Sequence, residues 1–224
     1  QLAARQAGGA RTLGVREFPD DARLLRHRGH RLISVREFEL ATQALERAAL
    51  LVAGRADEVE PDGQPNASGV QLETLQSNIH YHLGLARYLN GDFERAAQAF
   101  RDALALSTNA DNRCSASHWL CTSLRRGGHA QQALEVAAAI RADLAIVEYH
   151  SYHQLCLVYQ GTRAADERLA EARAKGLAST DFATIGFGGG AWHLSAGRSA
   201  RARAIFSEVC SAPTWHAFGH IAAE

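Results

Sequence analysis

The chain has 224 residues, of which 46% are hydrophobic and 21% charged, so it can bury a core as one domain or as a short array of repeats. This excludes a disordered chain and a small protein held together by disulfides. Lys+Arg and Asp+Glu both total 24, so the net charge is zero and predicts neither nucleic acid nor an anionic membrane as partner. No apolar run is long enough for a transmembrane segment.

The sequence leaves the compartment open. It begins at Gln1 and contains no Met, so the protein is expected to be soluble and either cytoplasmic or exported after loss of an N-terminal leader. Cysteines stand at positions 114, 121, 156 and 210 without a CxxC pair, which argues against a zinc knuckle or a thioredoxin-type motif. We expect all four to be small buried side chains.

Residues 1–19 have weak periodicity and predict a loose N-terminal arm. From residue 20 to 224, apolar residues recur with helical spacing and strict alternation is absent, so the predicted fold class is all-α. Turn signals containing glycine recur at positions 91, 128, 161 and 197, separated by 37, 33 and 36 residues. Such a period predicts stacked helical hairpins, each of which covers the apolar face of the next.

The clearest unit runs from Asn78 to Leu104 and places Leu83-Gly84, Tyr88, the turn Asn90-Gly91-Asp92-Phe93, then Ala96, Phe100 and Ala103 at fixed offsets. In these residues the chain resembles the tetratricopeptide repeat family and is expected to be a bacterial member of it. The resemblance implies an α-solenoid of antiparallel helix-turn-helix repeats. Small residues at Gly84, Ala96 and Ala103 would let the two helices approach closely.

The same offsets predict five units and a closing helix. Their expected bounds are 21–53, 77–107, 114–141, 148–174 and 183–211, with a capping helix at 213–224. In the first unit, Arg36 stands where a turn glycine is usual. The fourth unit is the weakest, because Glu167 and Glu171 fall where Ala and Phe are expected, and its register stays open.

An insertion at 54–68 separates the first two units. It is polar and rich in turn residues, so we expect it to stay out of the core, either as a lid over the groove or as a free loop. Its acidic residues could lie against the nearby arginines. Gly188-Gly189-Gly190 interrupts a predicted helix, where close helix contact is the simpler explanation and a kink or a ligand approach the alternative.

In the family, the first helix of each hairpin lines a concave groove, and the resemblance assigns positions to that face. The predicted binding groove comprises Arg23, Arg26, His30, Asn78, Tyr81, Tyr88, His118, Thr122, Arg125, Tyr149, Tyr152 and Phe187. Ser34, Leu85, Ser115, Tyr159 and Thr184 are further positions of the same face. Arginines beside aromatic rings suit an extended peptide with carboxylates, although an aromatic stripe can equally be inter-repeat core. The family's lysine and asparagine clamp for a chain-terminal carboxylate is not matched, since Tyr81 and His118 stand where its lysines would be expected.

Eleven histidines raise the alternative of a metal site. The pairs His216 and His220, and His150 and His153, have the spacing of one helical face and are weak candidates for metal ligands. His80 and His82 would point away from each other. No third ligand is indicated by spacing, so neither a metal nor another cofactor is predicted.

No catalytic constellation can be located, and we predict a protein that is not an enzyme. The main prediction is a protein–protein interaction module, an adaptor or scaffold that holds a peptide or a partner protein in a concave groove. One alternative is a metal-binding or metal-dependent protein that uses the paired histidines. Another is a structural repeat protein that forms a homo-oligomer through Trp215 and Phe218 on the cap helix. No nucleic acid partner is expected.

Overall fold

A computed structural model describes residues 18–60, 66 and 68–224, so the predicted N-terminal arm lies almost wholly outside the described residues. The secondary-structure elements of the described residues are α-helices, and the only β-structure among these residues is an isolated bridge between Val59 and Thr74. The predicted all-α class is confirmed. The chain divides into two units, the first ending at Asn112 and the second beginning at Arg113.

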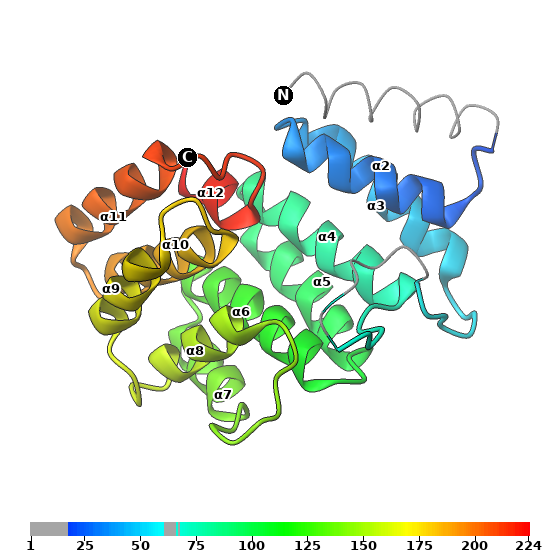
Figure 1. The fold of residues 1–224 in the computed structure, drawn as a ribbon. Coiled ribbons are helices and arrows are strands. Elements are labelled where there is room, and N and C mark those ends of the chain that lie inside the picture. Colours follow the sequence, from blue (N-terminus) through cyan, green and yellow to red (C-terminus); the bar gives the residue numbers. More distant parts are fainter. Residues whose placement is uncertain (1–17, 61–65, 67) are drawn as a thin grey trace. The chain divides into compact units, whose positions relative to one another are not determined.

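The helices follow one another as antiparallel hairpins, the repeat organisation of an α-solenoid (Figure 1). The first unit contains α2 (Ala22–Ser34), α3 (Phe38–Val52), α4 (Leu75–Leu89) and α5 (Phe93–Ala105). α6 (Ala110–Arg126) lies mostly in the second unit, followed by α7 (Ala130–Ala138), α8 (His150–Tyr159), α9 (Ala165–Lys175), α10 (Thr180–Ser195), α11 (Ser199–Ser211) and the short α12 (Phe218–Ala223). Within the described residues, no helix has the length and apolar character needed to cross a membrane.

Each predicted turn glycine ends a first helix in the left-handed backbone region. Their φ angles lie between 75° and 84°, and Arg36 takes the same conformation with φ 68°. In the second hairpin the N–H of Asp92 donates to the carbonyl of Arg87 at 2.9 Å, and the N–H of Gly91 to that of Tyr88 at 3.0 Å. This pair of bonds is a Schellman motif. The same pair recurs around Arg36, so that hairpin keeps the turn although its residue carries a Cβ that disfavours it.

Small residues allow the helices of a hairpin to touch. A Cβ placed on Gly84 would lie 2.7 Å from the ring of Phe100, and one on Gly190 would lie 2.3 Å from the ring of Phe206. Close contact is therefore the explanation for Gly188 and Gly190, the former against Leu155. Gly189 differs, because a Cβ there would meet no atom within 4 Å.

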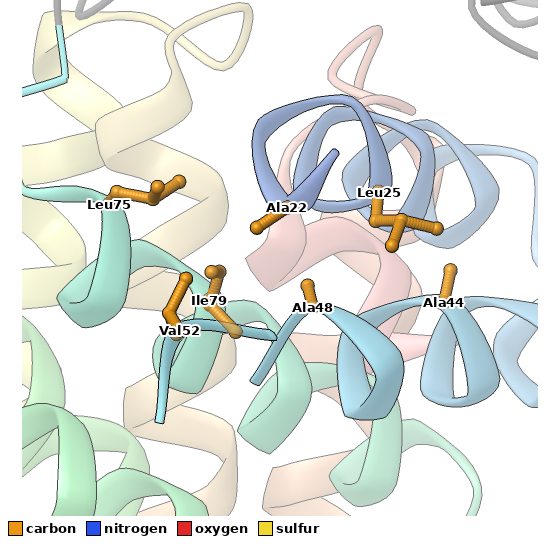
Figure 2. Close-up of a cluster of buried hydrophobic side chains, with 7 residues drawn as sticks. All are labelled: Ala22, Leu25, Ala44, Ala48, Val52, Leu75 and Ile79. Carbon is orange, nitrogen blue, oxygen red and sulfur yellow. The ribbon is translucent and has the colours of Figure 1, made fainter. Parts of the chain in front are cut away.

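The core of the first unit lies where α2, α3 and α4 meet. Figure 2 shows its buried side chains, to which all three helices contribute. They are Ala22, Leu25, Ala44, Ala48, Val52, Leu75 and Ile79. Alanines at helical spacing on α3 give a smooth stripe against which its neighbours pack closely.

The structure gives the register of the fourth hairpin, which the sequence left open. The buried residues of α9 are Ala165, Leu169 and Ala172, with the same spacing as Ala96, Phe100 and Ala103 on α5. Glu167 and Glu171 are exposed. The reason is the turn after Gly161, where α9 begins at Ala165, so the helix is rotated relative to the offsets of the other hairpins.

The insertion at 54–68 was expected to stay out of the core, and this expectation is wrong for its first part. Asp57 caps α4, because its Oδ1 accepts from the N–H of Gln76 at 2.9 Å and its Oδ2 from the hydroxyl of Thr74 at 2.6 Å. The N–H of Leu75 donates to the carbonyl of Glu58 at 2.9 Å. Residues 57–60 therefore accept the hydrogen bonds of N–H groups in the first turn of α4, as an N-cap does. We call these four residues the acidic segment.

Two further expectations are corrected at the C-terminal end. The cap helix begins at Phe218, so Trp215 lies in the turn before it and not on the helix. Three of the four cysteines are buried as expected, but Cys210 is exposed on α11, and all four are free thiols.

Candidate functional site

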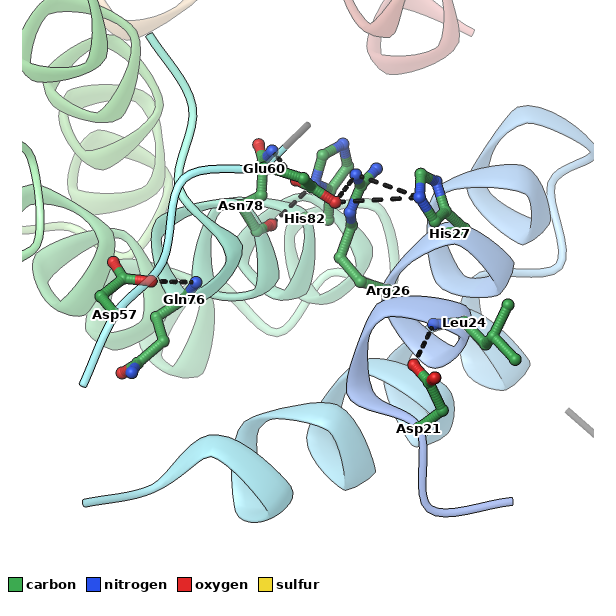
Figure 3. Close-up of polar contacts among 9 residues, drawn as sticks. All are labelled: Asp21, Leu24, Arg26, His27, Asp57, Glu60, Gln76, Asn78 and His82. Carbon is green, nitrogen blue, oxygen red and sulfur yellow. Dashed lines mark hydrogen bonds and ion pairs between the residues drawn. The ribbon is translucent and has the colours of Figure 1, made fainter. Parts of the chain in front are cut away.

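Arg26 on α2 is buried and paired with a carboxylate of its own chain. Its guanidinium donates to Glu60 of the acidic segment, and the side chain of Asn78 on α4 donates to the other oxygen of the same carboxylate (Figure 3). Arg26 is 6% exposed and Glu60 1%. The pairing buries two opposite charges together with a hydrogen-bond donor, which compensates much of the cost of removing them from water.

The acidic segment also reaches Arg23, whose guanidinium lies 2.9 Å from a carboxylate oxygen of Glu58. The expectation that the acidic insertion would lie against nearby arginines is thus confirmed. As a consequence, Arg23, Arg26 and Asn78, predicted to bind a partner, are engaged by the chain itself. The basic character that the sequence predicted for this part of the face is neutralised.

Three histidines lie around the Arg26–Glu60 pair. His27 Nε2 lies 3.8 Å from Glu60, and the rings of His30 and His82 are 4.7 Å apart. Burial, reinforced by the charge of Arg26, lowers the pKa of His82 to about 3, and burial together with His82 holds the pKa of His30 well below its ordinary value. The rings of His30 and His82 are therefore neutral at neutral pH and act as packing groups.

The two predicted groove tyrosines of the first unit differ in exposure. Tyr88 is buried and meets Phe93 edge to face at 5.3 Å, so it belongs to the core of its hairpin. Tyr81 is half-buried, with its ring 5.9 Å from that of Phe100. Only Tyr81 keeps part of its ring surface open.

In the second unit, three predicted groove residues are core residues. His118 is fully buried on α6, and its Nδ1 lies 2.8 Å from the hydroxyl of Tyr159. Burial lowers the pKa of His118 to about 3. Phe187 stacks on Trp119 at 5.1 Å, and Thr122 donates its hydroxyl to the carbonyl of Trp119 at 2.9 Å. Their buried surroundings remove these residues from the predicted face.

Arg125 lies half-buried at the end of α6 and is held by two aromatic rings. The central carbon of its guanidinium is 4.5 Å from the ring centre of Trp192 and 5.6 Å from that of Tyr159. Its Nη1 donates to the hydroxyl of Ser195 at 3.3 Å. Cation–π contact of this kind fixes the plane of the guanidinium without neutralising its charge.

Tyr149 and Tyr152 are half-buried at the start of α8 and meet edge to face at 5.8 Å. The ring of His118 lies 5.2 Å from Tyr152 and 5.7 Å from Tyr159. The aromatic residues of α8 therefore continue through His118 to the rings that hold Arg125. We call Tyr152, His118, Tyr159, Arg125 and Trp192 the aromatic stripe.

The candidate metal ligands do not come together. His216 lies in the turn before α12 and is exposed, whereas His220 is buried with its Nδ1 3.3 Å from the hydroxyl of Thr214. His153 is buried with its Nε2 2.9 Å from the carbonyl of Arg141, and His150 is exposed. Across residues 18–60, 66 and 68–224, no group of three or more His, Cys, Asp or Glu is arranged to hold a metal ion.

Sequence reasoning missed Glu60, Trp192 and Ser195. The acidity of the insertion was a signal for Glu60, but nothing in the sequence selects it over the neighbouring carboxylates. Extending the face of α10 beyond Phe187 by helical spacing would have reached residues 191–195.

Comparison with known proteins gives a family match for one repeat. The family model described as tetratricopeptide repeat matches residues 77–110, the unit that the sequence marked as clearest. Among solved structures, the chain is similar to the crystal structure of YrrB, described as a TPR protein with an unusual peptide-binding site. The identity is 19%, with 94% of this chain and 96% of that chain covered and a TM-score of 0.43, too low to transfer residues or ligand. A search of curated proteins finds no match.

One repeat of the chain, residues 77–110, thus matches the tetratricopeptide repeat family, and the other hairpins repeat the same helix-turn-helix organisation. Proteins of this family are generally interaction modules without enzymatic activity, and a protein–protein interaction module is the class that the repeats support here.

Proposed function

We propose that this protein binds an extended segment of a partner protein on the first-helix face of its second unit. The observation that carries the proposal is the aromatic stripe, in which half-buried Tyr152, Arg125 and Trp192 come from three successive first helices, α6, α8 and α10. Aromatic rings and arginine are the residue types most enriched at the energetic centres of protein interfaces. A role as an adaptor or scaffold follows from such binding.

The first unit supports the proposal in a different way. Its basic residues are paired with the acidic segment, so a partner would have to break the buried Arg26–Glu60 pair to use them. Breaking such a pair costs about 3–5 kcal/mol. A partner can bind the second unit without breaking a buried ion pair, and we assign the binding face to this unit.

Site-specific photo-crosslinking tests this assignment. A photoreactive phenylalanine derivative at position 152 would lie on the proposed face, and the same group at Leu134, which is 43% exposed on the second helix α7, is the matched control. Under native conditions we expect one partner to crosslink at position 152 and not at 134. Crosslinking at 134 alone, or at neither position, would refute the proposed face.

The same experiment separates the two alternatives. A homo-oligomer would give crosslinks between copies of this chain, which mass spectrometry identifies directly. Metal dependence would make the crosslink sensitive to a chelator.

A further inference from the structure

Arg125 carries a fixed charge that the described part of the chain does not neutralise. Its contacts are the rings of Trp192 and Tyr159 and the hydroxyl of Ser195. No carboxylate in residues 18–60, 66 or 68–224 lies within ion-pair distance of it, and its Nε is buried without a hydrogen-bond partner among those residues.

Several other arginines of the second unit are paired with carboxylates. Arg173 holds Glu208 through two nitrogens, with its Nε at 2.7 Å, and Arg168 lies 2.6 Å from Glu171. Arg201 reaches Asp166 from α11 at 2.5 Å. Acidic side chains are thus present in this unit, but Arg125 contacts aromatic rings instead of one of them.

Such an arrangement suits the capture of an anion. A guanidinium stacked on rings is weakly hydrated and has its planar fork fixed in advance, so little conformational entropy is lost when it binds a carboxylate through two parallel hydrogen bonds. Half-burial strengthens the interaction, because the effective dielectric constant beside the rings is lower than in water.

We infer that Arg125 is the anchor for a side-chain carboxylate of the bound segment, a glutamate or an aspartate. This rests on the proposed function and names the chemistry of its partner. One positive charge matches one carboxylate, whereas phosphorylated segments are typically held by clusters of arginines. The half-buried rings of Trp192 and Tyr152 then take apolar side chains that flank the acid.

The length of the stripe fits a short extended segment. Tyr152 and Tyr159 are seven residues apart on α8, which corresponds to about 10 Å along the helix axis. An extended chain covers this distance in about three residues. One short peptide segment that contains an acidic and an aromatic residue can therefore reach both Arg125 and the ring of Tyr152.

The test uses full-length protein and the synthetic heptapeptide acetyl-Ala-Phe-Ala-Glu-Ala-Phe-Ala-amide. Versions with Gln or phosphoserine in place of Glu are the comparison probes, and the indole N–H signal of Trp192 in NMR spectra is the readout. We expect the Glu peptide to shift this signal saturably and to bind about tenfold or more tightly than the Gln peptide. We expect Arg125→Met to remove that difference.

Two control variants keep the result interpretable. Arg126→Met changes the neighbouring exposed arginine and should leave the affinity for the Glu peptide unchanged. Arg125→Lys keeps the charge but lacks the planar fork, so it should recover only part of the affinity. Thermal melts of each variant establish that it is folded.

Equal affinity for the Glu and Gln peptides, no binding of the Glu peptide, or unchanged binding by folded Arg125→Met would overturn the carboxylate anchor. A phosphoserine peptide that binds about tenfold more tightly than the Glu peptide would overturn it in favour of a phosphate site. If Arg125→Met still crosslinks the same partner at position 152 with the same yield, the anchor is wrong and the proposed function stands. Absence of crosslinking at position 152 when Arg125 is intact would instead overturn the proposed function itself.

Discussion

Replacing Glu60 by Gln tests whether the acidic segment is part of the folded core. The substitution keeps the shape of the side chain and removes its charge, leaving Arg26 buried without its counter-ion. Arg26 is 6% exposed and Glu60 1%, so solvent cannot compensate for the loss. From this burial we expect the free energy of unfolding to fall by about 3–5 kcal/mol.

The assay is urea unfolding followed by far-UV circular dichroism, with hydrogen exchange to localise the effect on α2 and α4. Tryptophan fluorescence is a useful second probe, because the three tryptophans, at positions 119, 192 and 215, all lie in the second unit. Exchange protection should fall in α2 and α4, where the pair is anchored. Fluorescence then shows whether the second unit follows.

A double-mutant cycle separates the pair from the side chains that form it. Arg26→Met together with Glu60→Gln should be more stable than Glu60→Gln alone, because no uncompensated charge stays buried. The exposed pair of Arg47 and Asp20 is the matched control, and Asp20→Asn should change stability by no more than about 0.5 kcal/mol. A loss below about 1 kcal/mol for Glu60→Gln would refute the reasoning, since it would mean that water reaches Arg26.

Three further predictions follow from burial and backbone geometry. Burial lowers the pKa of both His82 and His118 to about 3 from the ordinary 6.5, so as the pH falls below 6.5 these residues take up protons in the unfolded chain but not in the folded one. Each residue should therefore lower the free energy of unfolding by about 2 kcal/mol between pH 7.5 and 5. Equal urea midpoints at the two pH values would contradict this. Arg36→Gly should raise stability by about 1 kcal/mol, since Arg36 has φ 68°, and a lower melting temperature would show that its side chain matters more than its backbone. Gly219→Ala should lower the free energy of unfolding by about 2 kcal/mol, because the new Cβ would lie 2.3 Å from a backbone carbonyl oxygen. Gly189→Ala, whose Cβ would meet no atom within 4 Å, should be neutral or stabilising by up to about 1 kcal/mol. Equal effects of the two substitutions in thermal melts would contradict the packing.

The hairpin organisation could be predicted because its determinants are local. The turn at Gly91 depends on hydrogen bonds between residues at most five apart in the sequence, and only a residue that tolerates positive φ completes it. Even Arg36 was recognised from its position as a substitute for glycine. The register of the fourth hairpin could not be predicted, because the turn after Gly161 is longer than the turn after Gly91 and the fixed offsets no longer apply.

The candidate site depended on contacts that sequence spacing cannot fix. The resemblance to the tetratricopeptide repeat family assigned His118, Thr122 and Phe187 to the groove face of a first helix. It could not show that neighbouring helices cover them, because burial depends on how each helix is rotated against the next. Arg125 was predicted as a binding residue from its position, but its rings come from α8 and α10.

The amino-acid sequence by itself thus determined the repeat, its turns and the small residues that let paired helices touch, since these are properties of a chain segment and its nearest neighbours. Only the tertiary structure decided which charges are already neutralised. The resemblance assigned both Arg26 and Arg125 to the groove face, but a residue 34 positions away supplies Arg26 with a carboxylate. Arg125 instead lies against aromatic rings, and no carboxylate of the described residues is within ion-pair distance of it. Long-range packing, which no local pattern encodes, separates a structural arginine from a candidate anchor.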